Sequence, residues 1–581
     1  MQLQLGPVYD PLINNIIIGN YNLLDDISMV IKITDAYYEW VVDLLQTTQK
    51  ELNHRDELVS LSFKIKVIDR IKAQFFPRYR DFEKIFQKGY LYENKNLSHL
   101  SYWPTNDEQQ KRLQQNYKFS DEFYINFVQS SVAPPKLKRA LNKKIPVVLT
   151  QQDMRNHTFI VSRTDTGKST LILELAKNIV DTKRGNLILM EPHGDLSIDL
   201  ARLCKNSDDL IFIDPFLSQN HSVTVNIFDM QNISQESISK YSALVLNTFK
   251  QIIGAEFSVT MHSLLNPVIA VLLQIPNTSF FDLLRFLNDD ENHDLLEYAK
   301  KHALIPSHRL FFQKQFSQSR YSITKFSIIS KLNVLLQDSI FSNMLTGRST
   351  INLQEAMNTP GKIIIIRLNT IKMIETIEPI GRFLVALFVS YAFQRESIPI
   401  HKRVDTHLMI DEASMFLGDS IELILAQARK FHLYLLMAVQ NNAQLPTSIE
   451  ASILSNTAMK FVGMNSHKNH SIMSKEIGVS MDQLFSLQKK GEFFIKVGNQ
   501  QARKFRVSDR LLHKKHYVSQ AIFTQMMQNQ LKKYYRSINT VDIEYADVPY
   551  IDIEKEKPYS KDATSHLLED VSNSDDELLD Y

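Results

Sequence analysis

The sequence predicts an α/β fold in which a mainly parallel β-sheet is covered by helices. From Ile145 onward, short apolar runs alternate with helical segments, which is the pattern of parallel strands joined by helices. The chain has 581 residues, of which 44% are hydrophobic and 22% charged, so it can bury several large cores. We therefore expect a main α/β domain, a helical insertion within it and a mainly helical N-terminal region.

Changes of pattern along the chain mark the boundaries between these parts. The consecutive prolines Pro134 and Pro135 indicate a linker, because proline cannot continue a helix. A run of acidic residues near the C-terminus is typical of a disordered tail. The expected parts are a mainly helical N-terminal domain (1–132), a linker (133–144), the first part of the main domain (145–232), an all-helical insertion (233–347), the second part of the main domain (348–510) and a C-terminal extension with the acidic tail (511–581).

Individual strands are expected where short apolar runs end at turn residues. These strands are His157–Val161, Asn186–Met190, Leu210–Ile213, Lys362–Arg367, Thr406–Ile410, Tyr434–Val439, Met459–Val462 and Glu492–Val497. Helices are expected where apolar residues recur at three- and four-residue spacings. They are Lys168–Val180, Ile380–Gln394, Ser420–Phe431 and Ser448–Asn456, with Ile238–Ile253, Met261–Leu273, Phe280–Leu287 and Ser322–Leu336 in the insertion.

Charge, cysteine content and hydropathy narrow the class of protein. The 66 Lys and Arg against 64 Asp and Glu give a net charge of +2, so a nucleic-acid surface would require local charge segregation. The single cysteine, Cys204, excludes an internal disulfide and fits a reducing compartment. No targeting segment is visible, and no apolar run has the roughly 20 residues that a spanning helix needs. We expect a soluble, cytoplasmic protein.

A phosphate-binding loop is expected directly after the first of these strands. The run S-R-T-D-T-G-K-S-T lies between an apolar strand and an amphipathic helix, which is the context that such a loop requires. The residues expected to contact a triphosphate are Ser162, Arg163, Thr164, Asp165, Thr166, Gly167, Lys168, Ser169 and Thr170. Lys168 would reach the β- and γ-phosphates, and the Ser169 hydroxyl would bind Mg²⁺.

The loop departs from the usual pattern at its first position, where Ser162 replaces glycine. A side chain there restricts the backbone dihedrals that glycine allows. Two alternatives to a working site remain: a chance Gly-Lys-Ser in a surface turn, and a degenerate loop that binds nucleotide without hydrolysing it.

A second acidic element, Asp411-Glu412, ends the strand Thr406–Ile410. In a nucleotide-hydrolysing sheet, such an Asp supports Mg²⁺ and the following Glu polarises the attacking water. Gln440 ends a later strand and suits a sensor of the γ-phosphate, and Arg429 suits a cation that stabilises transition-state charge. The alternatives are that the acids mark the start of a helix and that Arg429 with Lys430 caps the end of one.

Together these blocks resemble the type IV secretion coupling-protein ATPases, the conjugative DNA-transfer branch of the HerA/FtsK-like P-loop translocases. The resemblance extends over residues 145–507 and depends on the order and spacing of its blocks. These blocks are Pro146–Val161 with the phosphate loop, Met190–Leu196, Asp411-Glu412 and Ala428–Gln440.

The resemblance implies a RecA-like P-loop NTPase core, ATP and Mg²⁺ as ligands, and a homohexameric ring that moves DNA. It implies that Lys168 and Ser169 bind triphosphate and Mg²⁺, and that Asp411 supports the metal. It also implies that Glu412 activates water, that Gln440 is the sensor and that Arg429 reaches into an adjacent subunit. Implied partners are DNA, further copies of the chain, a relaxase–DNA complex and membrane secretion-channel proteins. Such partners would hold a cytoplasmic protein at the inner membrane.

A basic segment in the insertion is the candidate DNA surface. Residues 300–348 contain eight Lys or Arg against one acid, Asp338, with aromatic residues between them. The candidate DNA contacts are Lys314, Arg320, Lys325 and Lys331, which would bind the phosphate backbone without base specificity. The alternative is a solvated helix face with its phenylalanines in the core.

Two functions follow from these motifs. The first is an ATP-dependent DNA translocase of conjugative transfer, which the paired carboxylates and Arg429 favour. The second is a nucleotide-binding DNA or relaxosome adaptor with weak or no hydrolysis, which Ser162 favours.

Overall fold

The computed structural model describes residues 16–25, 29–30, 32–33, 135–183, 185–228 and 235–538. Most of the N-terminal region expected to be helical, and the acidic tail, lie outside the described residues. Within the described part, no helix is both long enough and apolar enough to cross a membrane.

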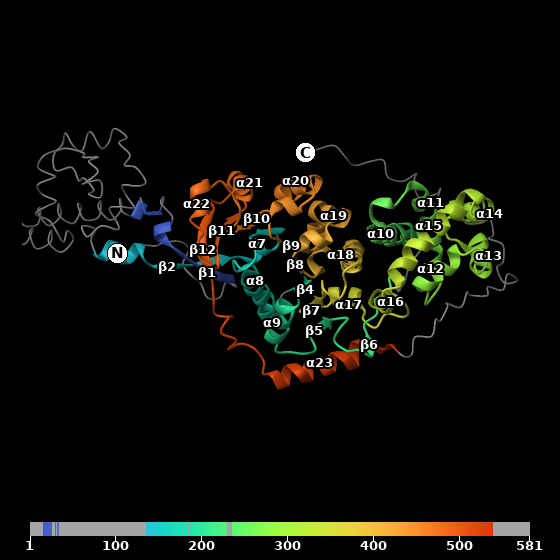
Figure 1. Ribbon diagram of the computed structural model, residues 1–581, viewed down its shortest axis with the longest axis horizontal. Coiled ribbons are helices and arrows are strands. Elements are labelled where there is room, and N and C mark those ends of the chain that lie inside the picture. Colours follow the sequence, from blue (N-terminus) through green and yellow to red (C-terminus); the bar gives the residue numbers. More distant parts are fainter. Residues whose placement is uncertain are drawn as a thin grey trace, which may run out of the picture.

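Among the described residues, eleven strands form one large sheet, which occupies the centre of Figure 1. Its order is β2-β1-β12-β11-β10-β3-β9-β8-β4-β7-β5. The seven strands from β10 to β5 are mutually parallel: β10 (Met459–Val462), β3 (Thr158–Val161), β9 (Leu433–Val439), β8 (Thr406–Ile410), β4 (Asn186–Glu191), β7 (Ile363–Arg367) and β5 (Leu210–Ile213). The mainly parallel sheet that the sequence predicts is therefore confirmed.

The parallel strands are apolar throughout because both of their faces are covered. Successive residues of β8 point to opposite faces, so Leu408 lies in one core and Met409 in the other. Helices α8 (Lys168–Thr182) and α9 (Asp195–Leu203) cover the Met409 face, and α18 (Ile377–Gln394) covers the Leu408 face. All seven of these strands were predicted within one residue at each end.

The antiparallel strands at one side of the sheet are β11 (Glu492–Val497), β12 (Arg503–Val507), β1 (Ile16–Asn22) and β2 (Lys144–Leu149). Strand β1 lies in the region expected to be mainly helical, most of which lies outside the described residues. It pairs with β2 and β12, both far away along the chain, so its local sequence carried no sign of the partners. The expected linker contains helix α6 (Pro135–Leu141), in which Pro135 occupies the first position, where its missing N–H costs nothing.

The segment expected to be an all-helical insertion contains only helices from residue 235 to residue 345. They gather at the right of the sheet in Figure 1. They are α10 (Gln235–Ile253), α11 (Val259–Leu272), α12 (Phe280–Leu287), α13 (His293–His302), α14 (Pro306–Lys314), α15 (Ser319–Leu336) and α16 (Ser339–Leu345). Helix α10 packs against α18, and this contact joins the helices of residues 235–345 to the sheet.

The remaining helices and two short strands surround the sheet. They are α7 (Gln151–Met154), α17 (Leu353–Asn358), α19 (Asp419–Gln427), α20 (Thr447–Asn456), α21 (His467–Ile477), α22 (Met481–Phe485) and α23 (Gln520–Tyr534), with β6 (His221–Ser222) paired to β13 (Arg536–Ser537). None of the helices expected from the sequence lies beyond Asn456, yet α23 lies along the edge strand β5 (Figure 1). There the Gln530 amide donates to Leu210 O and accepts from Phe212 N, both at 2.9 Å. These two bonds give hydrogen-bond partners to backbone groups on the open edge of β5.

Candidate functional site

The phosphate loop lies at the carboxyl edge of the parallel strands. It follows β3 and leads into α8, whose first residue is Lys168. Ser162 N donates to Val439 O at 3.2 Å, and Arg163 N donates to Met464 O at 3.1 Å, so β9 and the segment after β10 hold the start of the loop. Gly167, at the helix N-cap, has φ of 103°, a value that favours glycine. The backbone N–H groups at the start of a helix such as α8 form a site for phosphate.

The side chain at the irregular position, Ser162, is accommodated by the tertiary structure. Ser162 is fully buried, its φ is not positive, and its hydroxyl forms a hydrogen bond with the Thr166 hydroxyl. The space comes from Gly463, after β10, because a Cβ there would lie 2.1 Å from Ser162 Oγ. The loop therefore avoids the strain expected from a missing glycine.

Replacing Gly463 with alanine is expected to destabilise the protein by about 1–3 kcal/mol, because the added methyl overpacks the site against Ser162. ATP affinity should fall with it, since Ser162 begins the loop. Thermal unfolding and ATP titration would measure both effects. The double variant Gly463→Ala with Ser162→Gly should recover part of the loss, the rest remaining because Phe493 Cε1 is 2.8 Å from the same Cβ. Equal losses in the single and double variants would contradict this pairing.

The loop lysine contacts the acidic pair, although Glu412 lies 244 residues further along the chain. Lys168 Nζ lies 3.0 Å from Asp411 Oδ1 and 2.6 Å from Glu412 Oε1, and all three side chains are buried. Gln440 Nε2 donates to the same Glu412 oxygen at 3.1 Å. Strand β9, which Gln440 directly follows, lies between β3 and β8, so the carboxyl ends of these three strands bring the four side chains together. The structure thus joins Lys168, Asp411, Glu412 and Gln440 in one site.

Glu412 has a backbone conformation that is unusual for its residue type. Its φ of 51° lies in the left-handed region, which non-glycine residues adopt rarely and often at functional positions. Glu412 N donates to Asp411 Oδ1 at 3.0 Å, which ties the two acids together. This turn directs the Glu412 carboxylate toward Lys168 and Gln440.

The electrostatics of the site suit a divalent cation and a triphosphate. Burial alone would lower the pKa of Lys168, but the attraction of Asp411 and then Glu412 outweighs it and the pKa is raised. Burial raises the pKa of Asp411, against the opposing effect of Lys168. Two carboxylates face one ammonium, so the buried group carries an excess of negative charge that Mg²⁺ would neutralise. Asp411 and the hydroxyl of exposed Ser169 are the residues that fit this ion.

The other loop residues differ in exposure. Thr166 is buried, and its hydroxyl donates to Arg163 O at 2.7 Å. The remaining members of the expected phosphate-contacting set face solvent, fully or in part. They are Arg163, Thr164, Asp165, Ser169 and Thr170.

Sequence reasoning missed Glu191 as a functional candidate. It ends β4, next to β8, and is almost fully buried. Its two carboxylate oxygens accept hydrogen bonds from Gly194 N at 2.6 Å and Ser197 N at 2.9 Å, which orients the start of α9. Its position at a strand end, one residue before the Pro-His-Gly turn, was the available signal.

Glu191 should make the stability of the protein depend on pH. Burial raises its pKa, hydrogen bonds from Ser197 and Gly194 oppose the rise, and the charge of Asp411 adds to it. A carboxyl group with a raised folded-state pKa contributes stability that is full below its unfolded pKa, about 4.3, and is lost as the pH rises through the folded pKa. Relative to Glu191→Gln, the wild type should therefore lose stability as the pH rises above the unfolded pKa of about 4.3. Denaturant unfolding at several pH values would test this, and parallel pH profiles would contradict it.

Arg429 is not brought to the phosphate loop of its own chain. The expected helix ends at Gln427 and tightens into a 3₁₀ turn, η6 (Ala428–Phe431), that contains Arg429. His432 O accepts from Thr406 N at 2.8 Å, at the amino end of β8, whereas Asp411 follows its carboxyl end. A five-residue strand is about 16 Å long, so Arg429 lies near the opposite edge of the sheet.

The four candidate DNA contacts differ in exposure. Lys314 and Arg320 are exposed, and Lys331 pairs with Glu256. Lys325 is buried, lies 2.5 Å from Asp289 Oδ1 and stacks 3.6 Å from the centre of the Phe316 ring. This corrects the expectation for Lys325, whose ammonium does not face solvent. The two acidic partners, Asp289 and Glu256, lie outside the basic segment of residues 300–348.

The fold and the loop define a class of protein. A phosphate loop between a buried strand and a helix, in a mostly parallel sheet with an acidic pair two strands away, is the P-loop NTPase arrangement of a RecA-like core.

Comparison with solved structures gives particular proteins to which the chain is similar. The bacterial plasmid coupling protein TrwB, in complex with the non-hydrolysable ATP analogue ADPNP, is 17% identical over 65% of this chain and 92% of its own, with a TM-score of 0.48. VirB4 of Thermoanaerobacter pseudethanolicus is 15% identical over 63% of this chain and 94% of its own, with a TM-score of 0.43. A coupling protein of conjugation is thus among these structures, as the sequence blocks indicated.

No protein-family model matches the chain, and no curated protein matches it.

Proposed function

We propose that this chain is an ATP-dependent DNA translocase of the type IV secretion coupling kind, which hydrolyses ATP between the subunits of a ring. The observation that supports this most directly is the meeting of Lys168 with Asp411 and Glu412, at 3.0 and 2.6 Å, across 244 residues of sequence. A phosphate-binding loop alone would serve binding. A buried carboxylate held by a lysine and a glutamine beside that loop suits the chemistry of hydrolysis.

Each residue of the site would have its own role in binding or hydrolysis. Lys168 and the N–H groups at the start of α8 bind and orient the phosphates, while Ser169 and Asp411 hold Mg²⁺, which neutralises phosphate charge when bound. Glu412 accepts a proton from the attacking water, and Gln440, on the same carboxylate, holds that acceptor in place. Each of these groups lies at one edge of the sheet.

Arg429 would complete the site of a neighbouring copy. Its side chain is exposed, and its guanidinium makes no hydrogen bond or ion pair with any residue that the structure describes. An arginine supplied by a neighbour stabilises the charge that develops on the transferred phosphoryl group. This role makes a ring of subunits, expected to be a homohexamer, necessary for turnover.

DNA is the proposed substrate for movement, with the exposed Lys314 and Arg320 as backbone contacts on the helices between β6 and α17. Cations of this kind bind phosphates without reading base sequence, as a translocase requires. A relaxase–DNA complex and secretion-channel proteins are the proposed further partners.

Steady-state ATP hydrolysis with and without DNA tests the function. We expect DNA to stimulate the wild type, Lys168→Ala to abolish turnover, and Lys515→Ala, which changes an exposed lysine that is not part of the site, to leave it unchanged. Tight ATP binding with no turnover under any DNA condition would overturn the translocase and favour the nucleotide-binding adaptor. ATP turnover that is unaffected by DNA would limit the proposal to an ATPase.

A further inference from the structure

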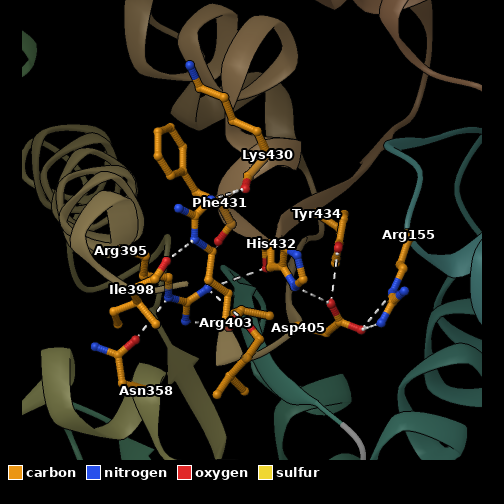
Figure 2. A network of polar contacts seen from close by, with 12 residues as sticks. Arg155, Asn358, Arg395, Ile398, Arg403, Asp405, Lys430, Phe431, His432 and Tyr434 are labelled. Atoms are coloured by element: carbon orange, nitrogen blue, oxygen red, sulfur yellow. Dashed lines mark hydrogen bonds and ion pairs between the residues drawn. The ribbon is translucent and has the colours of Figure 1, made fainter. Parts of the chain in front are cut away.

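The turn that carries Arg429 is anchored by two arginines from outside it. Figure 2 shows these contacts around Phe431 and His432, which follow Arg429 along the chain. The backbone carbonyls of Lys430, Phe431 and His432 all accept hydrogen bonds from Arg395 or Arg403. The carbonyls at the end of this turn therefore have fixed partners, while the side chains of Arg429 and Lys430 face solvent.

Arg403 contacts this turn from the segment just before β8. Its Nη1 donates to Lys430 O at 2.6 Å, and its Nε donates to Ile398 O at 2.8 Å. Its guanidinium also lies over the Phe431 ring, 5.4 Å from the ring centre. Arg403 thus holds both the backbone next to Arg429 and the aromatic side chain that ends the turn.

Arg395, at the end of α18, is fully buried and joins four parts of the chain. Its Nη1 donates to Phe431 O at 3.0 Å and to Val404 O at 2.9 Å, and its Nη2 donates to the Thr406 hydroxyl at 2.9 Å. Its Nε donates to the Asn358 side chain at 2.9 Å. Burial lowers the pKa of Arg395 to about 10, so it remains charged at neutral pH. A buried cation satisfied chiefly by carbonyl and hydroxyl oxygens fixes geometry more than it adds stability.

Asp405 adds a third attachment at the amino end of β8. Its carboxylate accepts a hydrogen bond from Tyr434 Oη at 3.0 Å, lies 2.9 Å from His432 Nδ1 and pairs with Arg155 at 2.8 Å (Figure 2). The turn is therefore joined to the first residues of β8, the strand whose other end carries Asp411 and Glu412. A strand is a rigid link between its ends, so the Arg429 turn and the carboxylates of one chain are held in a set relation.

We propose that Arg395 and Arg403 are positioning residues that hold Arg429 at the orientation in which it meets the triphosphate bound by a second copy of this chain. This inference rests on the proposed function. Within the described ranges, the Arg429 guanidinium makes no hydrogen bond or ion pair that would order it, and its own phosphate loop lies at the opposite edge of the sheet. Its orientation therefore depends on the backbone on which it is mounted.

The test uses assemblies of two kinds of subunit. Arg403→Ala should lower ATP turnover at least tenfold with little change in ATP affinity, because its own phosphate loop is intact. Co-assembly with an excess of Lys168→Ala subunits, which cannot bind phosphate productively but carry an intact Arg429 turn, should restore turnover per Arg403→Ala subunit. Arg429→Ala should be restored in the same way. Arg403→Lys, which keeps a cation beside Phe431, should retain part of the activity.

Three outcomes would overturn the inference while leaving the ATPase in place. The first is failure of Lys168→Ala subunits to restore Arg403→Ala when they do restore Arg429→Ala. The second is an equal loss in Arg382→Ala, which changes an arginine paired with Glu378 on the surface of α18. The third is a loss of DNA affinity in Arg429→Ala without restoration, which would assign the turn to DNA. A wild type without ATP turnover would instead overturn the proposed function together with this inference.

Discussion

Replacing Glu412 with glutamine is expected to lower the rate of ATP hydrolysis by about 10²- to 10⁴-fold, the usual contribution of a general base. The amide has the same shape as the carboxylate but cannot take a proton from water. ATP affinity should be kept or increased, because a negative charge 2.6 Å from Lys168 Nζ is removed. Phosphate release measures the rate, and nucleotide titration of the same preparation measures the affinity.

Glu355→Gln is the matched control, since Glu355 is exposed at the start of α17 and remote from the phosphate loop. It should leave both quantities unchanged. Retention of normal turnover in Glu412→Gln would remove Glu412 from the chemistry. A joint loss of turnover and affinity would show that Glu412 supports the site structurally.

Lys168→Ala should abolish ATP binding and also destabilise the nucleotide-free protein by about 3–5 kcal/mol. The reason is that Asp411 and Glu412, both buried, would lose the cation that neutralises them. Unpaired buried carboxylates have raised pKa values, so the loss of stability should be largest at neutral pH and shrink as the pH falls and they become protonated. Thermal unfolding with and without ATP, from about pH 4.5 to 7.5, measures these effects.

Lys177→Ala on the same helix is the control for this experiment. Lys177 is also buried, but its partner Asp181 is half exposed, so removal of Lys177 leaves a carboxylate that water can solvate. We expect a much smaller loss of stability there. Similar losses in the two variants would mean that burial of the lysine stem, and not the pairing with two buried acids, controls stability at Lys168.

The parallel part of the sheet could be predicted because each of its strands can be recognised from its own residues. Strands buried on both faces need unbroken apolar runs, such as Leu-Ile-Phe-Ile at 210–213, and turn residues limit them. Strand β1 could not be predicted in this way, because its pairing to β2 and β12 is made by backbone groups of distant segments. Helix α23 carries many polar residues, and its place along β5 depends on hydrogen bonds from Gln530 to that strand.

The candidate site likewise has residues that the sequence predicts and residues whose surroundings it does not predict. Lys168, Asp411, Glu412 and Gln440 could be chosen from the sequence because each stands at the end of a predicted strand or the start of a helix. The carboxyl ends of parallel strands meet at one edge of a sheet. The exposure of the basic segment could not be predicted from its net charge, because the partners of Lys325 and Lys331 lie outside that segment. Asp289 lies in the turn after α12, and Glu256 lies in a 3₁₀ helix before α11.

The sequence by itself determined which segments along the chain of the main domain form strands and which form helices. It also determined the residue types at the phosphate loop. Periodicity and short motifs are local properties, so both could be found without the tertiary structure. Only the tertiary structure decided that Ser162 fits beside Gly463, that Lys325 is buried and that Arg395 and Arg403 hold the turn of Arg429. Each of these depends on atoms brought into contact from distant segments, and contact distances are set by packing of the whole fold.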